Sequence, residues 1–452
     1  MYHTLSKVGI AALVGLAALS AQAGVSAEEA AKLKSELTPF GAERAGNKDD
    51  SIPAWTGGVA KPGELTGRRP DPFAGEKPLF SITAKNAAQY ADKLNEGNQA
   101  LFKKYPDTYR IDVYKTQRTA AAPQWVYDNT FRNASQASTV ESDGGPIPKG
   151  AYGGIPFPIP KNGVEIMWNH ILRWRGEAVH MDYKAYQLTT DGRWIMVVDA
   201  SNDMAMPFYF KEGNADSYQG EHWLVRAVNI GPPIRSGEGI LGRMQLDESK
   251  SQSWVYLTGQ RRIRKLPNPC CDTPSPFSAG VSTFDEVDVF SNRMDKFNWK
   301  LVGKQEMYIP YNGNKIQNAK SDAVILGSGR HLNPDELRWE LHRVWVVEAT
   351  LKPGQRHVLP KSRYYLDEDT WEVVLSDRWD ANGQLARTGF EVMLAMPDLP
   401  GTVGLPQGVY DLISGSGFVL GLDAEVKRPY QAVPRQKDTL FSPDSLAAEG
   451  VR

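Results

Sequence analysis

Hydrophobic and polar positions divide the chain into an irregular first third and a long region of short apolar runs. These runs are rich in β-branched and aromatic residues and end at turn-forming residues, which is typical of strands. Asp191-Gly192 and Asn382-Gly383 lie beside such runs and indicate hairpins. The pattern predicts one large antiparallel sheet over residues 161–400, with strands at 166–174, 193–200, 253–266, 299–309, 342–351, 362–367 and 371–380.

The segment before this sheet has a different character. Residues 27–37 and 86–105 have the apolar spacing of helices, and each ends just before or at a proline. Between them, residues 41–80 hold too many glycines and prolines for a regular element. We expect residues 24–160 to form helices and a long irregular wrap.

Two further features complete the predicted organisation. Asn333 before Pro334 predicts one helical turn between strands, because Asn caps a helix and proline fits its first position. Residues 401–452 are expected to form an irregular C-terminal extension that packs on the same unit.

The first residues have the pattern of an export signal. Lys7 precedes an apolar and glycine stretch from Val8 to Leu19, and Ala21-Gln22-Ala23 fits the cleavage rule of signal peptidase. A membrane span needs about 20 apolar residues, so the stretch is short for a permanent anchor. We expect residues 1–23 to be a signal peptide, cleaved after Ala23 or, alternatively, after Ala27. The mature protein is expected in the periplasm, soluble or peripheral to a membrane.

Composition narrows the function classes. Hydrophobic residues make up 41% and charged residues 23% of the 452-residue chain, which is typical of a folded, soluble protein. With 52 basic and 53 acidic side chains, the net charge of −1 gives no general attraction for nucleic acid. We therefore expect no nucleic-acid partner.

Residues that usually carry catalysis or bind metals form no complete motif. The histidines lack ligand spacing, Gly415-Ser416-Gly417 is not a nucleophile elbow, and residues 367–369 look like an acidic hairpin turn. Adjacent Cys270 and Cys271 are expected to be ordinary loop residues, because a bridge between neighbours is strained. We therefore expect no enzyme activity, no cofactor and no metal.

Two stretches, Ser253 to Tyr308 and Arg338 to Ala386, resemble the strands and long hairpins of LolA/LolB-like outer-membrane lipoprotein-sorting proteins. The first contains SWVYLTGQRRIRKL, with Thr258 where the family's strand has proline. Together with TPFGAERAGNKDDSIPAWTGG near the N-terminus, nearly the whole chain is similar to an uncharacterised exported family of Gram-negative bacteria, a domain of unknown function that carries this fold. The chain is longer than one carrier domain, so the resemblance leaves its ligand and partner open.

The resemblance implies a mainly β (α+β) fold, an open half-barrel whose curved antiparallel sheet is covered by helices and holds acyl chains on its concave face. Alternate strand residues face opposite ways, so Trp254 and Tyr256 share one face while Val255 and Leu257 share the other. A sheet that is apolar on both faces needs cover on both, or a ligand on one. The alternative is a two-layer core without a cavity.

Candidate binding residues follow from this picture. A basic strand end with Arg262 and Arg264 on one side is expected to contact an acidic headgroup or a partner. The alternative for these arginines is a solvated rim, or ion pairs with acidic residues at 285, 286 and 288. The hydrophobic ligand is expected at aromatic residues of the sheet, namely Trp168, Trp194, Trp254, Tyr256 and Trp345.

Two functions fit the sequence. The first is a non-enzymatic periplasmic carrier for a lipid, a lipoprotein acyl chain or another hydrophobic molecule, with an inner-membrane exporter and an outer-membrane protein as candidate partners. The second is a secreted carbohydrate-active β protein, because Trp and Tyr side chains also stack on sugars.

Overall fold

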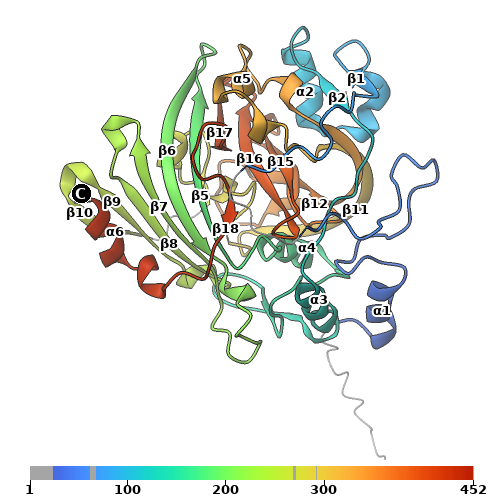
Figure 1. The fold of residues 1–452 in the computed structure, drawn as a ribbon, viewed down its shortest axis with the longest axis horizontal. Helices are drawn as coiled ribbons and strands as arrows, with labels where there is room; N and C mark the ends of the chain where they lie inside the picture. Colours follow the sequence, from blue (N-terminus) through green and yellow to red (C-terminus); the bar gives the residue numbers. More distant parts are fainter. Residues whose placement is uncertain (1–23, 62–67, 268–270, 292, 451–452) are drawn as a thin grey trace, which may run out of the picture.

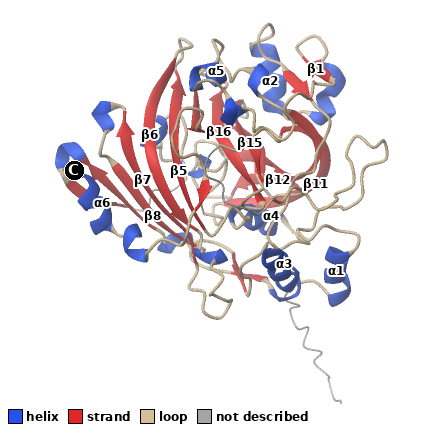
Figure 2. Cartoon of the chain, in the orientation of Figure 1, coloured by secondary structure: helices blue, strands red, loops and turns tan. Residues whose placement is uncertain are grey.

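The computed structural model describes residues 24–61, 68–267, 271–291 and 293–450. One large, strongly curved sheet dominates the fold and stays open rather than closing into a barrel (Figure 1, Figure 2). Its main path runs in the order β1 (Phe80–Ile82), β2 (Ile111–Val113), β12 (Trp339–Leu351), β13 (Lys361–Asp367), β14 (Val373–Trp379), β15 (Leu385–Met396), β16 (Gly401–Asp411), β17 (Gly417–Leu422), β5 (Ala178–Leu188), β6 (Trp194–Ala205), β7 (Glu221–Gly231), β8 (Gly239–Gln245), β9 (Gln252–Leu257) and β10 (Arg262–Leu266).

Three pairings lie beside this path. β11 (Phe297–Pro310) pairs with β12, and β18 (Gln431–Ala432) pairs with β5. A separate small hairpin joins β3 (Ser138–Val140) to β4 (Ile147–Lys149). Among the described strands, only the contact of β12 with β2 is parallel, so the prediction of a large antiparallel sheet and a mainly β fold is confirmed.

Two meanders make up the sheet, because strands that follow one another in sequence are also hydrogen-bonded neighbours. One meander runs from β5 to β10 and the other from β11 to β17. They join where β17 pairs with β5, with Val419 opposite Tyr186. The hairpin signals are confirmed at Gly192, between β5 and β6, and at Gly383, between β14 and β15; both have a positive φ that favours glycine.

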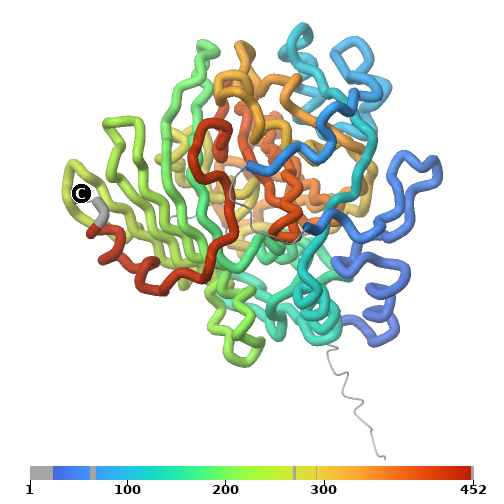
Figure 3. The backbone as a smooth tube through the Cα atoms, in the orientation of Figure 1, coloured from blue at the N-terminus to red at the C-terminus, as the bar shows by residue number. Residues whose placement is uncertain are grey.

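The helices are short and lie outside the sheet. They are α1 (Ala27–Ala31), α2 (Glu96–Lys104), α3 (Gln124–Gln136), α4 (Gly163–Ile171), α5 (Asp322–Leu326) and α6 (Pro443–Gly450), together with short 3₁₀ turns. α4 contacts β11 and β12, while α6 contacts β8, β9 and β10. Figure 3 shows the C-terminal segment running along the latter strands. No helix among the described residues is long and apolar enough to span a membrane.

The prediction of a strand at 166–174 is wrong, because this run forms α4. Asn162 caps the helix by accepting a hydrogen bond from the Glu165 amide at 3.0 Å. Almost every side chain of α4 is buried. A helix buried on all sides has no apolar period that distinguishes it from a buried strand.

Other segments differ in detail from their predictions. The helix expected at 27–37 is α1 followed by the 3₁₀ turn Lys32–Lys34, and that at 86–105 is divided into the 3₁₀ helix Ala87–Lys93 and α2. The run 253–266 is a hairpin, because a turn at Thr258–Gln260 separates β9 from β10. The helical turn after Asn333 is confirmed as the 3₁₀ turn Pro334–Glu336.

Residues 401–452, expected to be irregular, contribute β16 and β17 to the middle of the sheet.

Cys271 is buried and disulfide-bonded, so the expectation of an ordinary loop cysteine is wrong for it. The other cysteine of the chain, Cys270, and the expected signal peptide lie outside the described residues. The expected division of the chain into an N-terminal wrap and a sheet unit stays a prediction.

Candidate functional site

A cavity of about 230 Å³ lies on the inner face of the sheet. Its walls come from β5 to β9, β16 and β17, and we call these strands the cavity half of the sheet. Residues 275–291, the covering segment, lie over it, and the 3₁₀ turn Pro276–Ser278 of that segment contacts β5 and β6. The remaining strands of the second meander, β11 to β15, are the closed half.

Most of the cavity wall is apolar. Strands contribute side chains at alternate positions, so that Trp223, Val225 and Ala227 of β7 all face inward. Unbranched methionines fill irregular space and adapt to different ligands. The apolar wall includes Met181, Met204, Val225, Ile240, Met244, Phe277, Phe284, Val403, Leu405, Phe418 and Leu420.

One part of the wall is charged, and its charges are paired. Arg173 and Arg175 follow α4 and enter the cavity wall beside Asp288 of the covering segment. Arg175 Nη1 lies 2.6 Å from Asp288 Oδ2, and Arg173 Nη2 lies 3.5 Å from the same oxygen. Arg173 Nε lies 2.5 Å from Glu372 Oε1. Burial opposes ionisation of Asp288, but the two arginines outweigh it and hold the pKa of this carboxyl below its usual range.

Glu391 stands behind this charged wall. Its carboxyl is fully buried, and it approaches Gly404 so closely that a Cβ there would lie 2.3 Å from Glu391 Oε2. Burial and the neighbouring Glu372 raise the pKa of Glu391 well above its usual value. Both effects favour the uncharged form of the Glu391 carboxyl.

Other polar groups of the wall stand outside these ion pairs, among them Trp223, Asn202 and Glu248. The Trp223 Nε1–H and Asn202 Oδ1 are buried and make no hydrogen bond within the described chain. Glu248 accepts a hydrogen bond from the Ser251 hydroxyl at 2.7 Å, and burial raises its pKa to about 7. The cavity thus offers uncharged donors and acceptors beside an apolar surface.

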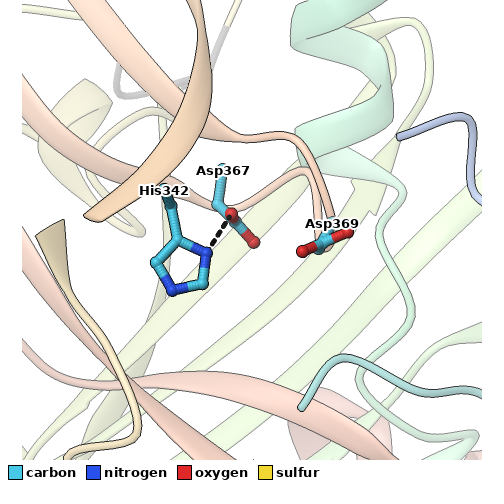
Figure 4. Close-up of side chains that lie close together, drawn as sticks. All are labelled: His342, Asp367 and Asp369. Atoms are coloured by element: carbon cyan, nitrogen blue, oxygen red, sulfur yellow. Dashed lines mark ion pairs between the residues drawn. The ribbon is translucent and has the colours of Figure 1, made fainter. Parts of the chain in front are cut away.

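A second polar cluster lies in the closed half, at the end of β12 and β13. His342, Asp367 and Asp369 are buried with their ligand atoms within 4.8 Å of one another, an arrangement that resembles a metal site (Figure 4). Arg118 occupies both oxygens of Asp369, at 2.8 and 2.6 Å. The ring Nε2–H of His342 donates to Glu340 at 3.1 Å, and Nδ1 lies 3.7 Å from Asp367 Oδ1.

Burial and neighbouring charges both act on the pKa values of this cluster. Burial alone would lower the pKa of His342, but the hydrogen bond to Glu340 and the charge of Asp367 raise it. Burial and Asp369 raise the pKa of Asp367 to about 7. Arg118 ties the cluster to the N-terminal wrap through the Glu43 carbonyl at 2.8 Å. These contacts give the cluster a structural role.

The structure does not bring the five predicted aromatic residues together, and none of them lines the cavity. Trp254 and Tyr256 point to the outer face of the sheet, where they pack with Leu241, Phe441 and Leu446 beneath α6. Their inward neighbour on β9 is Ser253. The alternation was predicted correctly, but the face that carries the cavity is the other one.

The remaining three aromatic residues are dispersed. Trp168 belongs to α4 and donates from Nε1 to the Pro146 carbonyl at 2.8 Å. Trp194 begins β6, and Trp345 of β12 stacks on Trp371 with ring centroids 6.0 Å apart. A role of these residues in ligand binding stays a prediction.

The basic side chains Arg262 and Arg264 are exposed on β10, at the edge of the sheet. Asp285, Glu286 and Asp288 pair instead with other arginines, among them Arg378 at 3.0 Å from Asp285. The exposed position agrees with either a solvated rim or a docking site, so the headgroup contact stays a prediction.

Sequence reasoning missed the residues that form the cavity. The run EHWLVRAVNIG of β7 has apolar residues at alternate positions and would have indicated a strand with one face inward. Arg173 and Arg175 stand in the RWR triplet next to the α4 run, but their pairing with the distant Asp288 leaves no local signal.

Solved structures and a curated relative are similar to this chain. A putative outer membrane lipoprotein-sorting protein domain from Vibrio parahaemolyticus is 12% identical, with a TM-score of 0.44, covering 63% of this chain and 98% of that one. A LolA superfamily protein from Nitrosomonas europaea is 12% identical, with a TM-score of 0.36, covering 63% and 100%. A DUF1329 family protein from Desulfovibrio piger is 12% identical, with a TM-score of 0.39, covering 60% and 92%.

Sequence matches are stronger than these structural ones. An uncharacterized protein of Pseudomonas aeruginosa is 39% identical over 431 residues, which cover 94% of each chain. Residues 81–447 match the family described as "Protein of unknown function (DUF1329)". The resemblance to an exported family of unknown function is thereby confirmed at the level of the family, and the chain belongs to the DUF1329 family.

Proposed function

We propose that this protein is a non-enzymatic periplasmic carrier or binding protein for a hydrophobic molecule, such as a lipid or a lipoprotein acyl chain. The observation that supports this most is the cavity of about 230 Å³ between the sheet and the covering segment. Ligand pockets are typically concave and mainly apolar with a few placed polar groups, which describes this cavity.

The construction of the cavity fits transfer rather than permanent storage. Its cover is a loop segment with short 3₁₀ turns rather than a packed helix layer. A segment of this kind opens at lower free energy than the sheet itself, which allows a ligand to enter and leave. An inner-membrane exporter and an outer-membrane protein are the candidate partners for such transfer.

The surface favours this proposal over sugar binding. The exposed large hydrophobic side chains of the described residues are aliphatic, and Trp, Tyr and Phe are all buried or half-buried there. A sugar platform of the usual kind needs an accessible aromatic face. The carrier proposal needs only the cavity.

Filling the cavity tests the proposal. Ala227 faces the cavity from β7, whereas Ile230 on the same strand is exposed. The variant Ala227→Trp should lower the uptake of a neutral fluorescent dye such as N-phenyl-1-naphthylamine at least tenfold. The control Ile230→Trp should bind the dye as the parent does.

Native mass spectrometry of the gently purified protein supplies the second measurement. Co-purified lipid that is present in the parent and absent from Ala227→Trp would support the carrier. Equal dye uptake by both variants, with no lipid in either, would refute it.

N-terminal sequencing tests the expected export signal. The sequence of the exported protein should begin at Gly24; a chain that keeps Met1 and stays in the inner membrane would contradict export in soluble form.

A further inference from the structure

We propose that the cavity selects neutral amphiphiles, apolar molecules that carry a hydroxyl or amide group, over fatty-acid-like anions. This inference rests on the proposed carrier function and names the class of its ligand. It follows from the charges and the unpartnered polar atoms of the cavity wall.

The arginines of the wall are already neutralised. Arg175 is bound to Asp288 at 2.6 Å and its guanidinium stacks on Trp223, 4.9 Å from the ring centroid. Arg173 is held between Glu372, at 2.5 Å, and Asp288, at 3.5 Å. A ligand carboxylate would have to displace a buried carboxylate from one of these pairs, which leaves that carboxylate without a counter-charge.

The described residues of the rest of the wall offer no free positive charge to an anion. Glu248 stands at the wall with a hydroxyl, that of Ser251, as its hydrogen-bond partner rather than a cation. Glu286 also lines the cavity, and Arg387 binds it at 2.5 Å from behind. A ligand anion would therefore meet the carboxyl groups of Glu248 and Glu286 in this part of the wall, where no free cationic side chain of the described residues lines the cavity.

An uncharged polar group of a ligand would supply hydrogen-bond partners for two polar atoms of the wall. Trp223 Nε1 offers a hydrogen and Asn202 Oδ1 accepts one; the two side chains are 9% and 6% exposed, and neither atom has a hydrogen-bond partner among the described residues. Buried atoms without a partner among the described residues also occur outside the cavity, but these two belong to side chains of its wall, and an uncharged polar group of the ligand is the partner that we propose for them. A hydroxyl or an amide both accepts and donates, as these two atoms require.

Displacement of bound N-phenyl-1-naphthylamine by dodecan-1-ol, dodecanoate and dodecane, at pH 8, tests the selectivity. Dodecan-1-ol should reach half-displacement at a concentration at least tenfold lower than dodecanoate and several-fold lower than dodecane. Equal or tighter binding of dodecanoate would overturn the inference and leave the carrier intact. If none of the three displaces the dye, the carrier proposal itself fails.

Variants assign the effect to the wall. Trp223→Phe keeps the ring beneath Arg175 but removes the N–H, so the advantage of dodecan-1-ol over dodecane should fall several-fold. Trp194→Phe is the matched control, because Trp194 Nε1 also lacks a hydrogen-bond partner among the described residues but lies outside the cavity wall. Asn202→Leu is the second wall variant. An unchanged advantage in both wall variants, or an equal loss in the control, would overturn the inference.

Discussion

The closed half and the cavity half of the sheet contain similar strands, but they differ in how completely other segments cover them. In the closed half, every residue of β14 is buried, and most of β13 and β15 are. In the cavity half, buried and half-buried residues alternate along β6 from Val198 to Met204, and Ser253 and Tyr256 are the buried residues of β9. The N-terminal wrap packs on the closed half (Figure 1), whereas the covering segment lies over the inner face of the cavity half and α6 packs on the outer face of β8 and β9. The cavity therefore arises from incomplete cover of an otherwise ordinary sheet.

The buried polar groups of the two halves do not follow this difference in cover. In the closed half, Asp377 accepts hydrogen bonds from Asn95 and from the Gly97 amide, and Arg378 binds Asp285. In the cavity half, Trp223 and Asn202 leave atoms without a partner among the described residues. Buried polar atoms without a partner among the described residues also occur in the closed half, for example Trp339 Nε1 and Trp345 Nε1, so such atoms alone do not distinguish the two halves.

The largest expected effect separates two tryptophans. Trp371 is fully buried in the closed half and donates from Nε1 to the Phe40 carbonyl at 2.9 Å. Trp371→Ala should lower the free energy of unfolding by about 3 to 5 kcal/mol, measured by urea denaturation. Trp223→Ala in the cavity half should cost at least about 1 kcal/mol less, because one side of its ring already faces open space. Equal losses would contradict the division of the sheet.

The next effect is a pH dependence of the closed half. Burial raises the pKa of Asp377 to about 6 in the folded state, above the ordinary aspartate value of 3.8. The stabilisation by this proton is fully present below about pH 4 and is lost as pH rises through about 6. Over that window Asp377 should reduce the free energy of unfolding by about 2 to 3 kcal/mol.

Urea denaturation between pH 4 and 7 checks this slope. Asp377→Asn should flatten the decline relative to the parent, because the variant has no proton to lose there. Asp128→Asn, at an exposed position of α3, should retain the parental slope. A slope that is the same in all three proteins would show that Asp377 does not carry the dependence.

A smaller effect is expected on the outer face of the cavity half. Trp254 is half-buried beneath α6, with Lys265 Nζ 5.6 Å from its ring centroid. Trp254→Ala should cost about 2 kcal/mol of stability, less than a fully buried tryptophan, and leave dye binding unchanged. A loss of binding without a loss of stability would place Trp254 in the ligand site after all.

The smallest effect concerns the edge strand β10. Replacing Arg262 and Arg264 with Gln should change the free energy of unfolding by less than about 1 kcal/mol each, because exposed charges contribute little. Thermal unfolding at two salt concentrations measures this. A large destabilisation would mean that the arginines are paired within the fold rather than free for a headgroup or partner.

Several elements could be predicted from the local sequence pattern. The elements that were missed or mistaken have physical causes. β12 to β14 were predicted because their β-branched and aromatic runs end at clear turns. β16 and β17 were missed because glycines and Pro406 interrupt them, which is tolerated where neighbouring strands fix the backbone. α4 was mistaken for a strand because burial on all sides removes its period.

The sequence alone determined the strand-rich class, the main hairpins and the alternation of side chains along each strand, since these depend on neighbours a few residues apart. Which face of β9 borders a cavity was decided only in the tertiary structure, because α6 covers one face from 190 residues away and the covering segment lies over the other. The pairing of Arg173 and Arg175 with Asp288 was likewise decided there. Ligand sites form where segments that are distant in the sequence leave a cavity between them, and the local sequence pattern carries no signal for such a cavity.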